Sequence, residues 1–322
     1  MNKLFTLKDI STYRSELMGW AILWIMMLHF TFTQIKPLGF IAQYGFAGVE
    51  IFMLVSGFGL YFSLNKNSNI SHFYKKRLLR IFPTYYILGI FASTLLYHDT
   101  IISYLYRYTT IGFWIGGVYS EWYIPSIVIL YLFAPFLKKL FDWKLLYIIA
   151  VVCCICLIIS YILVANNLIT KGEPHFFMLY RIPAFLLGMA CAYWIKNSIS
   201  KKYFYYLLLA GIPFFLLLFP RHHEIYNFKY FSLIFLLPLL TICFTSISKL
   251  IRIINPLLSA IGKASLEIYI IQGMFFHAIV TELIKIPIEF HDMISIFFII
   301  LSSILGISFH WLIEKIGITR LF

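Results

Sequence analysis

The sequence predicts an all-α, polytopic membrane protein with about ten transmembrane helices and with both termini in the cytoplasm. Of the 322 residues, 61% are hydrophobic and only 12% are charged. A soluble domain contains roughly 25% charged residues, so this chain lacks the side chains for a water-facing surface of ordinary size. Composition therefore excludes a soluble enzyme, a disordered chain and a fibrous protein. We expect one transmembrane domain over residues 1–322.

Ten apolar runs are long enough to cross about 30 Å of hydrocarbon, and the fourth is the shortest. Their approximate bounds are 17–35, 44–64, 81–97, 123–138, 145–165, 176–195, 203–220, 230–247, 265–284 and 293–313. The connections are short except for residues 98–122, which are rich in Tyr and Trp. We expect this outer segment either to lie in the membrane interface or to fold back over the outer mouth.

The basic residues between the runs predict the orientation. With the N-terminus inside, 19 of the 26 Lys and Arg residues fall in cytoplasmic segments. The seven on the outer side are Lys36, Arg107, Lys171, Arg181, Arg221, Lys229 and Lys285. This bias favours cytoplasmic termini and an even number of spans. Because the charge lies between apolar runs, the net charge of +13 indicates contact with anionic membrane lipid and no nucleic acid.

Two ionisable residues stand at membrane depth in the first two runs. His29 lies about 12 residues, or roughly 18 Å at 1.5 Å per residue, past the inner end of the first run, toward the outer half of the membrane. Imidazole suits proton transfer near neutral pH, although a histidine hydrogen-bonded between helices gives the same pattern. Glu50 needs a partner or a proton there, and a structural tie and a functional role are equally open.

A basic inner segment, HFYKKRLLRIFPTYY, follows the second run and contains Arg77 and Arg80. Residues three apart share one face of a helix, and guanidinium groups bind phosphate through paired hydrogen bonds. Positive-inside topology explains most of this charge. The arginine pair at a helix start, followed by Pro83, is more specific than topology requires. Among later polar residues, His310 and four other histidines near helix ends or in loops are interpreted as having no catalytic role.

Six segments in this order resemble the bacterial acyltransferase 3 family of integral membrane acyltransferases, in the form without a soluble esterase-like domain. GWAILWIMMLHF and GVEIFMLVSGFGLYF are similar to its first two helix signatures, and KKRLLRIFPTYY is similar to its basic inner loop. WYIPSIVILYLFAPFL, RIPAFLLGM and ASLEIYIIQ are similar to its later motifs. The resemblance runs from residue 14 to about residue 275, which is most of the chain.

The resemblance implies an enzyme of the bacterial inner membrane. It would move an acyl group, most often acetyl, from cytoplasmic acyl-CoA to a hydroxyl of a surface polysaccharide or lipid-linked sugar. His29 matches the essential first-helix histidine, and Arg77 and Arg80 match the pair linked to donor binding. We expect His29 to act as general base or as acyl carrier, with Glu50 orienting it or stabilising its charge. We expect acyl-CoA, commonly acetyl-CoA, as donor substrate and no metal.

The chain departs from the family pattern at three positions. Met18 stands where the family usually has an arginine, and Arg14, one turn earlier on nearly the same face, is expected to take that role in donor binding. Gln272 replaces a frequent histidine, and Ala184 replaces a frequent glutamate.

Two other functions are compatible with the sequence. The first is a transporter or flippase for a lipid-linked glycan, which requires a continuous polar path and no site for CoA phosphates. The second is a non-catalytic partner of a polysaccharide synthase, in which substitution of His29 would be harmless. The acyl group and the acceptor also stay open, since transfer of succinyl groups and N-acylation fit the same residues.

Overall fold

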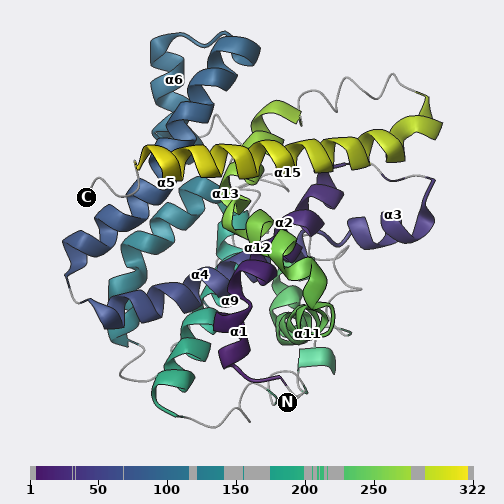
Figure 1. Cartoon of the computed structure of the whole chain (residues 1–322). Coiled ribbons are helices and arrows are strands. Elements are labelled where there is room, and N and C mark those ends of the chain that lie inside the picture. Colours follow the sequence, from purple (N-terminus) through teal and green to yellow (C-terminus); the bar gives the residue numbers. More distant parts are fainter. Residues whose placement is uncertain are drawn as a thin grey trace. The chain divides into compact units, whose positions relative to one another are not determined.

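The computed structural model is helical in every element that it describes (Figure 1). The described residues are 5–30, 32, 34–67, 69–115, 122–140, 155, 175–198, 205, 209, 211–213, 216, 228–276 and 287–317. For these residues the all-α prediction is confirmed.

Five of the described helices are long and apolar enough to cross a membrane. A sixth span results if the interrupted pair Ile234–Leu250 and Arg252–Lys263 is one crossing. The five are Ala47–Lys66 (α4), Ile70–Tyr97 (α5, Ile70–Ala92, continued by η1, Ser93–Tyr97), Tyr123–Leu140, Met178–Lys196 (within α9, His175–Lys196) and His291–Ile316 (α15). The predicted membrane character agrees with these helices.

Parts of the predicted span pattern fall on residues that the structure does not describe. The spans at 145–165 and 203–220 lie mostly outside the described residues, as does the second half of 265–284. The number of ten spans and the side of the termini therefore stay predictions.

The chain divides into two compact units, and each unit is assembled from three separate segments. The first unit contains Met1–Leu17, Val49–Ile70 and Ile129–Asn255. The second contains Met18–Gly48, Ser71–Val128 and Pro256–Phe322.

In the first unit, α4 and α9 pack through glycines. A Cβ atom at Gly57 of α4 would clash with the backbone carbonyl of Phe185, and one at Gly188 of α9 would clash with that of Leu54. Gly57 and Gly188 therefore allow α4 and α9 to approach closely.

In the second unit, α13 (Ser265–Ile271) and η4 (Gln272–Phe276) pack along α15 (Figure 1). Ile268 lies against Gly306, and the rings of Phe276 and Phe298 are 4.9 Å apart. From the first contact to the second, residue numbers rise along α13 and η4 and fall along α15. The two segments therefore run antiparallel.

The first helix ends earlier than the apolar run predicts. α2 covers Arg14–His29, and α3 is a separate helix over Lys36–Ala42 with Pro37 in its first turn. Proline has no N–H to donate and fits the start of a helix, which favours a new helix here over continuation of the old one. His29 is consequently the last residue of its helix.

The segment that follows α5 is also helical over α6 (Ile101–Tyr108) and α7 (Ile111–Ile115). The Tyr104 hydroxyl donates to the carbonyl of Tyr86 at 3.1 Å. The Tyr108 ring lies 5.2 Å from that of Tyr85. These contacts show that the segment folds back on α5.

Candidate functional site

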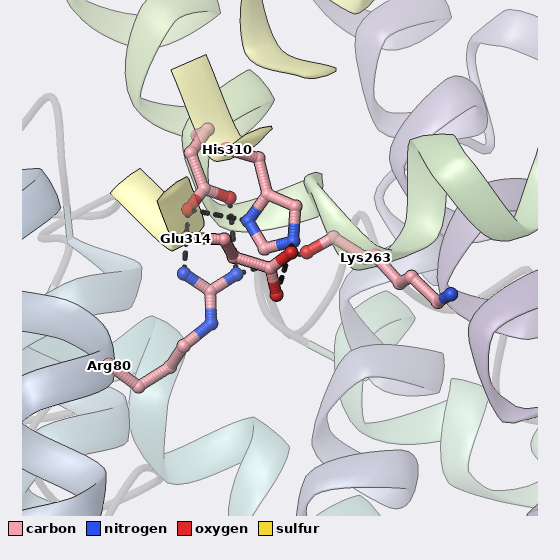
Figure 2. Close-up of polar contacts among 5 residues, drawn as sticks. Arg80, Lys263, His310 and Glu314 are labelled. Carbon is pink, nitrogen blue, oxygen red and sulfur yellow. Dashed lines mark hydrogen bonds and ion pairs between the residues drawn. The ribbon is translucent and has the colours of Figure 1, made fainter. Parts of the chain in front are cut away.

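Arg80 of α5 is held by a fully buried carboxylate. Its Nη1 donates to Glu267 Oε1 at 2.6 Å, and its Nη2 donates to Glu267 Oε2 at 3.1 Å. Nη2 also donates to the backbone carbonyl of Lys263 at 3.0 Å, as Figure 2 shows. The Glu267 side chain is 0% exposed and that of Arg80 is 35% exposed. The paired geometry satisfies a carboxylate that would otherwise be costly to bury.

His310 of α15 contacts the same carboxylate. Its Nδ1 lies 3.2 Å from Glu267 Oε1, and its Nε2 lies 3.5 Å from Glu314 Oε1, one turn further along the helix (Figure 2). Glu267 on α13 therefore joins α5 to α15. The sequence interpretation gave His310 no catalytic role and did not identify this contact. The feature of the sequence that could have indicated this contact is Glu267. It is an acidic residue in an apolar run, and such a residue requires a positive partner.

Arg77 lies one turn before Arg80 in different surroundings. Its side chain is half-buried, and its guanidinium carbon is 5.7 Å from the centre of the Phe73 ring. Within the part of the chain that the structure describes, its buried Nε has no hydrogen-bond acceptor. Both arginines lie on one helix, as predicted, but only Arg80 has a carboxylate partner among the described contacts.

His29 belongs to the same unit as the two arginines and is exposed at the end of α2. Five residues earlier, the indole Nε1 of Trp24 donates to the carbonyl of Ile41 at 2.8 Å, which ties α2 to α3. The His29 side chain therefore lies at the surface of the described structure.

Glu50 has the partner that its depth in the apolar run required. Arg181 Nη1 donates to Glu50 Oε1 at 2.6 Å, and the two side chains are 3% and 1% exposed, respectively. Both residues belong to the first unit, whereas His29 belongs to the second. Glu50 and Arg181 therefore form a buried ion pair between α4 and α9.

Arg14 begins α2, is exposed and belongs to the first unit. Its guanidinium lies along α4, where a Cβ atom at Gly59 would be 3.1 Å from Nη2 of Arg14. The structure therefore brings Arg14 to α4, and its expected role in donor binding stays a prediction.

Two further buried polar side chains lie on α15 and on the helix packed along it. Gln272 opens η4 and is 2% exposed, and Ser302 of α15 is 0% exposed. No partner exists for Gln272 Oε1 or Ser302 Oγ among the described residues. The contacts Ile268–Gly306 and Phe276–Phe298 flank both residues, which places them at one level of the helix pair. Gln272 was noted in the sequence as a departure from the family pattern, and Ser302 was not identified.

In the described ranges, no three His, Cys, Asp or Glu side chains are grouped so that they could hold a metal ion. Arg77 and Arg80 of α5 are candidates to hold an anionic substrate or cofactor.

Comparison with known proteins identifies relatives of the chain. An acyltransferase 3 family model, described as an acyltransferase domain, matches residues 17–314. This range includes His29, Glu50, Arg77 and Arg80. A protein of Acidianus two-tailed virus named "Putative acetyltransferase ORF330" is 30% identical over 182 residues, which are 54% of this chain and 53% of that protein.

The chain thus spans about half the length of the curated relative it matches. No solved structure matches it. The family match extends over most of the chain, and its range contains both the exposed histidine and the arginine pair. The chain therefore belongs to the acyltransferase 3 family.

Proposed function

We propose that the chain transfers an acyl group, in the simplest case acetyl, from acyl-CoA on the cytoplasmic side of a membrane to a hydroxyl of a surface polysaccharide or lipid-linked sugar. The observation that carries the proposal is that one unit presents both an exposed imidazole, His29, and the arginine pair Arg77 and Arg80. Both lie within the range that matches the acyltransferase family.

The arginines are proposed to bind the phosphates of CoA. Arg77 is the better candidate for direct contact, because no carboxylate neutralises it among the described contacts. Arg80 is fixed by Glu267 and by the Lys263 carbonyl, and it adds positive charge from a set position. Arg14 is proposed as a further cation for the donor.

His29 is proposed to act on the acceptor. As general base, its imidazole takes the proton of the acceptor hydroxyl while that oxygen attacks the thioester carbonyl. The carbon–sulfur bond then breaks, and the leaving thiolate receives the proton from His29. The products are an ester and CoA with a free thiol. Alternatively, His29 carries the acyl group between two such steps.

Glu50 is proposed to take part in the reaction by supplying a fixed negative charge, since Arg181 holds the position of its carboxylate. The inner membrane of a bacterium is the proposed location. There the bilayer would separate the cytoplasmic donor from the external acceptor, and the basic inner segment would contact anionic lipid.

The test is acyl transfer by purified protein in membranes, supplied with radiolabelled acetyl-CoA and a glycan extract. Wild-type protein should release free CoA thiol and label the glycan. His29→Gln should lose most of this activity, since glutamine keeps one hydrogen bond but cannot accept and return a proton. The expected loss is about 10²–10⁴-fold for a general base. His72→Gln, at an exposed histidine of the basic inner segment, serves as the matched control.

Near-normal transfer by His29→Gln would place the chemistry on another residue. If the wild-type protein labels no glycan and surface glycans are the same with and without the gene, the proposal is wrong. Movement of a lipid-linked sugar across the membrane without acylation would indicate a transporter instead.

A further inference from the structure

Asp292, in the first turn of α15, binds the backbone that follows the helix of His29. Its carboxylate accepts the N–H of Gln34 at 3.2 Å from each oxygen and the N–H of Ile35 at 2.6 Å. These residues lie 257 or 258 positions away in sequence and lead into α3. Asp292 is only 5% exposed, so these main-chain donors compensate for hydration that its carboxylate loses on burial.

Phe298 provides a second point of attachment from the same helix. Its ring is stacked on that of Phe30, with centroids 6.1 Å apart and planes 12° apart, and it also contacts Phe276 at 4.9 Å. Phe30 directly follows His29. α15 thus holds the chain at residue 30 and again at residues 34 and 35, and all these residues belong to the second unit.

The hydrogen bonds to Asp292 can hold the backbone at Gln34 and Ile35 in place, because they join a charged acceptor to main-chain donors. Gln34 and Ile35 precede the first turn of α3, where N–H groups have no acceptor within their own helix. Charge-assisted bonds to such groups are shorter and stronger than neutral ones, and their geometry does not depend on the side chains at positions 34 and 35.

We propose that Asp292 is a positioning residue for His29: by clamping the main chain at Gln34 and Ile35 it fixes the end of α2 and the direction of the imidazole. Its effect on catalysis rests on the proposed acyl transfer, whereas its effect on His29 can be measured without any activity. Asp292 itself takes no part in bond making or breaking.

The first variant is Asp292→Asn, which keeps the shape of the side chain and removes its charge. Its control is Glu289→Gln, which removes the same charge three residues earlier at an exposed position. The first readout is the rate at which diethyl pyrocarbonate modifies His29 in the purified full-length protein, followed by peptide mass spectrometry. The second is kcat and KM for acetyl-CoA.

Asp292→Asn should change the modification rate of His29 several-fold. It should also lower kcat by about tenfold or more, because small displacements of a catalytic group are costly. KM for acetyl-CoA should stay within about twofold, since Arg77 and Arg80 are untouched. Glu289→Gln should keep wild-type values in both measurements.

A second variant removes the N–H donor of residue 35 and leaves the Asp292 carboxylate in place. Ile35 has φ −86°, close to the range of proline, so Ile35→Pro deletes the shortest of these hydrogen bonds with little change of backbone angle. It should reproduce the effects of Asp292→Asn.

Unchanged His29 modification in both variants would overturn the inference, and so would a fall in kcat without any change at His29. If the wild-type protein transfers no acyl group but His29 modification responds to both variants, the clamp stands and the proposed function fails.

Discussion

Arg77 and Arg80 are one turn apart, yet their side chains have different neighbours. The spacing in the sequence predicted a shared face and a shared role in binding phosphate. It could not show that Glu267, 187 residues further along, would pair with one of them and not the other. Partners of this kind depend on which helices pack together, and spacing within one helix carries no information on that.

The two arginines should therefore respond differently to substitution. Arg77→Ala should weaken acetyl-CoA binding by about 1.5–3 kcal/mol, the usual contribution of a hydrogen bond to a charged group, and leave thermal stability unchanged. Arg77→Lys should restore only part of the affinity, since it keeps the charge and loses the planar fork. The measurements are acetyl-CoA binding to each purified variant and its thermal unfolding in detergent.

Arg80→Ala should lower stability as well as affinity, because among the described contacts it leaves the buried Glu267 with His310 as its remaining partner. Since Arg80 is partly exposed, we expect a stability loss of about 1–3 kcal/mol, at or below the low end for a broken buried pair. Equal stability of the two alanine variants would contradict this difference.

Glu50 and Arg181 allow a structural role to be separated from a catalytic one. Glu50→Ala should cost about 3–5 kcal/mol, because it leaves the guanidinium buried without its carboxylate. The double variant Glu50→Leu with Arg181→Met should recover most of that stability, since both charges are gone. Acyl transfer should stay low in the double variant if Glu50 takes part in the reaction. Full recovery of both stability and transfer would make the pair purely structural.

At the scale of single elements, the helix ends were harder to predict than the helices. The apolar run 17–35 located α2 but extended past its end at His29, because hydropathy does not register the new helix that starts at Lys36. The segment 98–122 was left with two interpretations, because the packing of its described part on α5 depends on tyrosine contacts between separate helices.

Helix packing in the first unit gives a prediction for glycine. Gly57→Ala should destabilise the protein by about 1–3 kcal/mol despite the higher helix propensity of alanine, because its Cβ atom meets the rigid backbone of Phe185. Gly273→Ala is the control, since a Cβ atom there meets nothing within 4 Å. Both are compared by thermal unfolding in the same detergent. If Gly57→Ala is as stable as Gly273→Ala, α4 and α9 do not depend on this close approach.

At the scale of the whole molecule, composition was enough to predict a helical membrane protein, but not the division into units. Each unit joins three segments that are distant in sequence, and its ion pairs link those segments: Arg80 with Glu267 in one unit and Glu50 with Arg181 in the other. The individual charges were visible in the sequence. Their pairing follows from long-range packing, which composition and periodicity do not encode.

The orientation of the whole chain is the last prediction, and it rests on the 19 of 26 basic residues in segments assigned to the cytoplasm. Because cytoplasmic loops retain Lys and Arg, a reporter fused after residue 322 should be cytoplasmic, and one inserted near residue 225 should be external. A cysteine introduced at exposed Lys75 should react with an impermeant thiol reagent only after the membrane is opened. Reaction in intact cells would place Arg77 and Arg80 outside, where cytoplasmic acyl-CoA cannot reach them, and would contradict the proposed donor site together with the topology.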